Sequence, residues 1–69
     1  MKLTTNQVAV LRHLATRGAR STLEISRACG LSKGSGAVLA ALRRRALIEG
    51  NWLGTRITPE GRAALRGAP

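Results

Sequence analysis

Three helix-start signals constrain the fold of this 69-residue chain more than any other feature. Each signal pairs a hydroxyl cap with a residue suited to the first helical turn: Thr4 with Gln7, Ser21 with Glu24, and Thr58 with Pro59. The first two pairs have the spacing of a capping box, and proline is well tolerated at the first helical position. Helices are therefore predicted to begin at Thr5, Thr22 and Pro59.

Glycines mark where two helices end. Gly18 and Gly30 follow the first and second helical segments, and glycine readily adopts the positive φ that closes a helix. The second helix is predicted over Thr22–Cys29. Ser32 is placed to cap a third helix, predicted over Ser32–Arg45, and the last helix should end at Arg66.

Apolar residues at helical spacing predict one small core. Its expected members are Val8, Leu11, Leu14 and Ala15 on the first helix, Ile25 and Cys29 on the second, Leu31 in the turn, and Val38, Leu39 and Leu42 on the third. Val10 is expected at the margin of the buried face and His13 on the solvent side. Residues 20–22 are expected to form either a minimal strand or a turn.

The segment Leu47–Thr58 predicts a β-hairpin. β-branched residues dominate its second half, and turn-forming residues lie between the halves: Gly50, Asn51 and Gly54. The hairpin tip would carry Trp52 and Leu53. Two roles are open for Trp52. It could contact a partner, by stacking, by wedging into the minor groove or by docking on another chain, or it could fold back over a core that contains no other aromatic residue.

The charge balance favours a polyanionic partner. Twelve Lys and Arg residues face only three acidic residues, which gives a formal net charge of +9. Most of these cations lie within foldable sequence, which is typical of a structured surface for nucleic acid. A domain of this size buries only about 60 % of the surface of its unfolded chain, so an enclosed active site is not expected.

Several other classes are disfavoured by residue content. Cys29 is the only cysteine and His13 the only histidine, so no disulfide, metal site or cofactor is predicted. Ser32 and Ser35 have no base and orienting acid at hand, so no catalytic residue is assigned. No apolar run approaches the ~18 residues of a membrane span, and the expected location is the cytoplasm, on the nucleoid if the chain binds DNA.

The order of helix, short strand, helix, helix, hairpin and short helix resembles the winged helix-turn-helix family, especially its MarR-type members. The matching residues are Leu3-Thr4, Gln7, Val10-Leu11, Leu14, Glu24-Ile25, Gly30-Leu31-Ser32, Leu39, Leu42, Leu47-Ile48 and Ile57-Thr58-Pro59-Glu60-Gly61-Arg62. The resemblance implies a single domain over residues 1–66: a three-helix core, a wing hairpin and a short C-terminal helix, mainly α with a little β. Residues 67–69 are expected to fray.

The resemblance also implies binding of duplex DNA, often as a homodimer, with the third helix in the major groove. The base-reading candidates carried over by position are Ser32, Lys33, Ser35 and Ala37 on this helix and Arg56 on the wing, with Asn51 and Trp52 at the wing tip. Phosphate contacts are predicted from Arg27, Lys33, Arg43, Arg44 and Arg56, with hydrogen bonds from Ser32, Ser35 and the main chain around Gly34.

Three departures from the family pattern affect this expectation. The recognition helix opens on Lys33-Gly34-Ser35-Gly36-Ala37, which offers few side chains for reading bases. The interval from Ser32 to Leu47 is one residue shorter than usual. Ala46 stands where the family commonly has glycine. Together these features favour a helix that binds phosphates more than it reads bases.

A small transcription or recombination regulator is the leading hypothesis. The alternative is a winged module that binds a protein, blocking or recruiting a nucleic-acid-handling partner. RNA binding is disfavoured because the stacking aromatics that read single strands are lacking. The last helix, with Ala63, Ala64 and Leu65, and the exposed part of the first helix are the predicted dimer surfaces.

Overall fold

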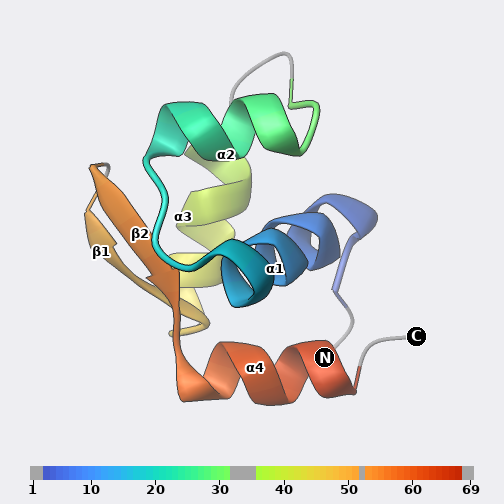
Figure 1. The fold of residues 1–69 in the computed structure, drawn as a ribbon. Helices are drawn as coiled ribbons and strands as arrows, with labels where there is room; N and C mark the ends of the chain where they lie inside the picture. The colour runs from blue at the N-terminus through green and yellow to red at the C-terminus, as the bar shows by residue number, and fades with distance from the viewer. Residues whose placement is uncertain (1–2, 32–35, 52, 68–69) are drawn as a thin grey trace.

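The computed structural model describes residues 3–31, 36–51 and 53–67, which form four α-helices and a two-stranded antiparallel sheet (Figure 1). In chain order the elements are α1 (Thr5–Arg17), α2 (Thr22–Ala28), α3 (Gly36–Arg44), β1 (Ile48–Asn51), β2 (Gly54–Ile57) and α4 (Pro59–Arg66). The predicted mainly helical layout with one hairpin is confirmed. Within the described residues, no helix is both long and apolar enough to cross a bilayer.

Both predicted capping boxes are present. The Gln7 backbone N–H donates to Thr4 Oγ1 over 3.1 Å, and the Thr4 N–H donates back to Gln7 Oε1 over 2.9 Å. Ser21 and Glu24 make the same reciprocal pair at 3.2 and 3.3 Å. These bonds satisfy backbone donors that have no partner within a helix, so α1 and α2 begin where the sequence predicts.

The hairpin pairs Ile48 with Ile57 and closes at Asn51 opposite Gly54. A one-residue bridge extends the sheet on its other side, where Arg20 and Thr55 exchange two backbone hydrogen bonds of 2.9 and 2.8 Å. The segment before α2 is therefore a minimal strand contact, one of the two predicted forms. This bridge ties the α1–α2 connection to β2.

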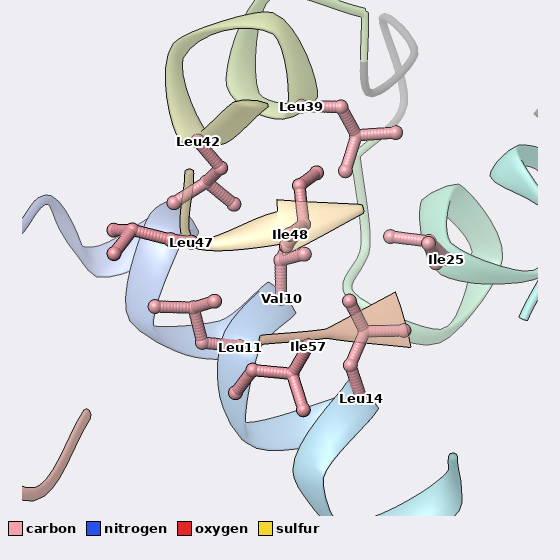
Figure 2. Close-up of a cluster of buried hydrophobic side chains, with 9 residues drawn as sticks. All are labelled: Val10, Leu11, Leu14, Ile25, Leu39, Leu42, Leu47, Ile48 and Ile57. Atoms are coloured by element: carbon pink, nitrogen blue, oxygen red, sulfur yellow. The ribbon is translucent and has the colours of Figure 1, made fainter. Parts of the chain in front are cut away.

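The core lies between α1, α2, α3 and the hairpin (Figure 2). Its nine buried apolar residues are Val10, Leu11, Leu14, Ile25, Leu39, Leu42, Leu47, Ile48 and Ile57. The prediction for Val10 was wrong, because this residue is fully buried while Val8 is only partly buried. α1 is contacted by α2, α3, α4 and β2, so its buried face is wide enough to include Val10. Cys29, predicted inside with Ile25, packs only partly against the core.

α2 ends in a Schellman motif one residue earlier than predicted. Cys29 is the cap residue rather than the last helical residue. The Leu31 N–H donates to the Ser26 carbonyl over 2.9 Å, and the Gly30 N–H donates to the Arg27 carbonyl over 3.4 Å. Gly30 has the positive φ of +68° that this motif requires.

α3 ends in the same motif, again one residue earlier than predicted, and Arg45 lies in the turn. The Leu47 N–H donates to the Leu42 carbonyl and the Ala46 N–H to the Arg43 carbonyl, each over 3.0 Å. Ala46 adopts a φ of +58°, so an alanine holds the position that Gly30 fills in α2. Glycine would adopt this φ without the steric cost that an L-residue bears.

Replacing Ala46 with glycine is expected to stabilise the protein. The left-handed conformation costs an L-residue about 1–2 kcal/mol, which exceeds the extra entropy that glycine loses on folding, about 0.5–1 kcal/mol. The expected gain is about 0.5–1 kcal/mol in the free energy of unfolding, measured by urea denaturation. Gly30→Ala is the matched control and should lose stability; a destabilised Ala46→Gly variant would contradict the assignment.

The start of α4 is fixed by Thr58 and Gly61. Thr58 Oγ1 accepts the Gly61 N–H over 3.0 Å and donates to the Ala46 carbonyl over 2.6 Å, which joins α4 to the end of α3. Gly61 is buried, and a Cβ at this position would overlap the Leu47 carbonyl oxygen. Gly67, predicted to belong to a frayed tail, caps α4 with its N–H 3.2 Å from the Ala63 carbonyl; residues 68–69 lie outside the described residues.

Candidate nucleic-acid interface

The outward face of α3 carries small residues in its N-terminal half and arginines at its C-terminal end. Leu39 and Leu42 point into the core, as Figure 2 shows, whereas Gly36, Ala37 and Ala40 are exposed. None of these three exposed residues carries a side chain beyond Cβ. The described front of α3 therefore allows close backbone approach to a partner but offers no side-chain group to read a base.

Arginines lie at the C-terminal end of α3, after these small residues. Arg43, Arg44 and Arg45 are exposed at and just beyond the end of α3. Arg43 Nη2 donates to the Gly50 carbonyl of β1 over 3.4 Å, so the cationic end of the helix is linked to the hairpin. The exposed side of the helix end, the following turn and the hairpin is here called the α3–hairpin surface. Its arginines are Arg43, Arg44, Arg45 and Arg56, and it also carries Glu49.

Arg56 lies on β2 directly opposite Glu49 of β1. Arg56 Nε is 3.2 Å from Glu49 Oε2, and the two side chains remain 65 % and 51 % exposed. An ion pair this open contributes little to stability, because water already solvates both charges. The pair brings the negative charge of Glu49 next to Arg56.

The hairpin turn is held by Asn51, which the sequence places at the wing tip. Asn51 Oδ1 accepts the N–H groups of Leu53 and Gly54 over 2.9 and 3.1 Å. Its carbonyl accepts the buried Thr55 hydroxyl over 2.9 Å. Asn51 therefore fixes the turn, and Leu53, 64 % exposed, projects beside it. Trp52, the other predicted tip residue, lies outside the described residues.

The predicted front of the recognition helix also lies outside the described residues. This covers Ser32, Lys33, Gly34 and Ser35. Of the predicted DNA-contacting residues, Ala37, Arg43, Arg44 and Arg56 are all exposed. Arg27 is exposed too, but it lies on α2 beside residues of α1.

Arg27 belongs to a second cationic surface that the sequence did not predict. Two shallow depressions between α1 and α2 share His13, Arg17 and Ala28 and so form one continuous trough, here called the α1–α2 trough. Its lining residues are Ala9, Arg12, His13, Thr16, Arg17, Arg20, Glu24, Arg27, Ala28 and Cys29. His13, predicted to face solvent, is half-buried there because α2 packs beside it.

Two titratable groups of the trough have altered acidity. The Ser21 backbone N–H, then the Ser21 hydroxyl, lower the pKa of Glu24, with smaller contributions from Arg20 and His13. Glu24 therefore stays ionised at a lower pH than an ordinary carboxylate does. Burial raises the pKa of the Cys29 thiol, so a smaller fraction of this group is thiolate at neutral pH than for a solvent-exposed cysteine.

Comparison of the chain with protein-family models, curated proteins and solved structures gives no match. Among the described residues, no group of three or more His, Cys, Asp or Glu side chains is placed to hold a metal ion.

Proposed function

We propose that this chain is a winged helix-turn-helix protein that binds duplex DNA through the α3–hairpin surface. The observation that carries the proposal is the junction of α3 and the hairpin, where exposed arginines lie on α3 (Arg43, Arg44), in the following turn (Arg45) and on β2 (Arg56), and where Arg43 bonds to Gly50. The order α1, α2, α3, β1, β2, α4 fits the layout of this class, with α3 as the recognition helix and the hairpin as the wing.

The mode of binding follows from the side chains. Guanidinium groups bind phosphate oxygens in a bidentate manner, and the arginines at the end of α3 and on β2 supply them. The described front of α3 presents Gly36, Ala37 and Ala40, so it approaches the duplex closely without reading bases. Binding is expected to depend on charge and DNA shape more than on base sequence.

A salt series on mixed-sequence nucleic acids tests this proposal. The chain should bind a 20-base-pair DNA duplex more tightly than the matching single strand or RNA duplex. About four phosphate contacts should lower the duplex affinity roughly 10²-fold between 50 and 200 mM salt. Millimolar duplex affinity at 50 mM salt would overturn the proposal and favour the protein-binding alternative, and tighter binding of either competitor would overturn the choice of duplex DNA.

Replacing Glu49 with glutamine is expected to strengthen duplex binding about three- to tenfold at low salt. The variant removes an anion from the wing and frees Arg56 for a phosphate. Fluorescence anisotropy of a labelled duplex measures the change. Glu60→Gln on α4 is the matched control, because it alters net charge equally away from the hairpin. Equal gains for both variants would show that only net charge matters.

A homodimer and a regulatory role remain proposals that follow from the resemblance. α4 offers a smaller apolar surface to a second copy than its sequence predicts, because Ala64 and Leu65 pack against the chain's own core and, of the three apolar residues, only Ala63 is exposed. Light scattering at several protein concentrations measures the oligomeric state. A concentration-independent monomer mass would contradict the homodimer.

A further inference from the structure

The α1–α2 trough carries a second concentration of arginines, separate from the α3–hairpin surface. Arg12 and Arg17 project from α1, while Arg20 and Arg27 lie just before and within α2. The cluster is not apparent from the sequence, because its members are spread over sixteen positions. Packing of α2 beside the second half of α1 brings them to one surface.

The trough has a large excess of positive charge. Glu24 is its one acidic lining residue. That carboxylate is held by the Ser21 N–H and hydroxyl at 3.3 and 3.1 Å and lies 3.8 Å from Arg20 Nε. In the described part of the chain, Arg12, Arg17 and Arg27 are exposed and lie beyond salt-bridge distance of any carboxylate.

The trough and the α3–hairpin surface point in different directions. Leu11 and Leu14 of α1 and Leu39 and Leu42 of α3 meet in the shared core, so the outward faces of the two helices lie on different sides (Figure 2). Figure 1 shows the same arrangement, with α1 and α2 in front and α3 behind them. A single duplex on the outward face of α3 would leave the trough open.

The shape of the trough favours an extended anion over a compact one. The trough is shallow and open, and some of its lining side chains are small, such as those of Ala9 and Ala28. Arg12 and Arg17 are separated by about 7.5 Å along the axis of α1. This length approximates two base-pair rises of about 3.4 Å each. Arg12 and Arg17, which both line the trough, are thus spaced along it to contact phosphates two nucleotides apart on one strand.

We propose that the α1–α2 trough binds the sugar-phosphate backbone of a second DNA duplex, so that one copy of the chain bridges two duplexes. The proposal rests on the proposed function, in which the α3–hairpin surface holds the first duplex. Arg12, Arg17 and Arg27 supply the phosphate contacts, and binding at the trough is independent of base sequence.

A two-duplex capture assay tests the bridge. A biotinylated duplex is fixed to beads, the full chain is added, and retention of a second, fluorescent duplex is measured. The wild-type chain should retain the second duplex. The variant R12S/R17S should retain at least about fivefold less while binding a single duplex within about threefold of wild type. R62S/R66S on α4 is the control with the same charge change and should bridge normally.

The outcomes separate this proposal from the proposed function. A wild-type chain that binds the first duplex but retains no second one overturns the trough alone, whereas a chain that binds neither overturns the proposed function as well. Bridging by R12S/R17S at the wild-type level would assign the bridge to a dimer using two α3–hairpin surfaces. An equal loss in R62S/R66S would assign it to net charge. Thermal unfolding confirms that each variant is folded.

Discussion

Replacing Gly61 with alanine is expected to lower the free energy of unfolding by about 3 kcal/mol, at the upper end of the usual cost of overpacking. The added Cβ would overlap the Leu47 carbonyl oxygen and lie 2.7 Å from Ile57 Cγ1. The Leu47 carbonyl accepts the Thr58 N–H over 3.1 Å, so it is held in place where α4 begins. Relief of the overlap would require α4 to move off the core.

Thermal unfolding followed by circular dichroism measures this effect, and a loss of about 3 kcal/mol should lower Tm by at least about 12 °C. Gly67→Ala is the matched control, because a Cβ there would lie 3.7 Å from the Ala64 carbonyl oxygen, an ordinary contact. A Gly61→Ala variant with the stability of wild type would show that α4 does not pack against Leu47 as described.

Replacing Arg43 and Arg44 together with alanine is expected to weaken duplex binding about 20- to 50-fold at low salt. Each lost phosphate contact should also reduce the slope of log affinity against log salt by about 1. Arg44 is exposed at the end of α3, and Arg43 joins that end to Gly50. Anisotropy titrations at four salt concentrations give both the affinity and the slope.

The control for this double variant is R62A/R66A on α4, which removes the same charge from another surface. It should lose less than about fivefold in duplex affinity. The single variant Arg44→Ala keeps the Arg43 link to the hairpin and should show about half of the change in slope. Equal weakening of both double variants would contradict a localised α3–hairpin surface.

Local signals predicted the helices well because each signal is satisfied within a few residues. Thr4 with Gln7 and Ser21 with Glu24 make their reciprocal bonds inside one helical turn, so no tertiary information is needed. The end of α3 was harder to predict, since Ala46 fills a positive-φ position without the glycine that marks it. Arg45 was assigned to the helix for this reason.

Burial depended on neighbours that the sequence does not reveal. Val10 becomes central because α1 packs against four other elements, and periodicity along one helix gives no information on their positions. His13 is half-buried for the same reason, since α2 covers one side of it. The core residues on α3 were easier, because Leu39 and Leu42 follow the helical spacing. Leu47, Ile48 and Ile57 were predicted as hairpin residues but not as members of the core.

The candidate site was predictable as a set of charges but not as a surface. Arg43, Arg44 and Arg56 were found from the cationic excess and the resemblance, yet their link through Gly50 and the pairing with Glu49 depend on the hairpin register. The α1–α2 trough required the packing of two helices. Its sequence signal is weak: His13 and Arg17 are four residues apart, and Arg20, Glu24 and Arg27 have helical spacing.

Backbone amide shifts during titration with a 12-base-pair duplex identify which elements contact DNA, and they test whether the α3–hairpin surface binds the duplex. Up to one equivalent of duplex, the largest changes should fall in α3, from Gly36 to Arg44, and in the hairpin, from Ile48 to Ile57. Binding of DNA by the α3–hairpin surface would be contradicted if these amide signals kept their positions while signals elsewhere moved, or if no amide signal moved at low salt.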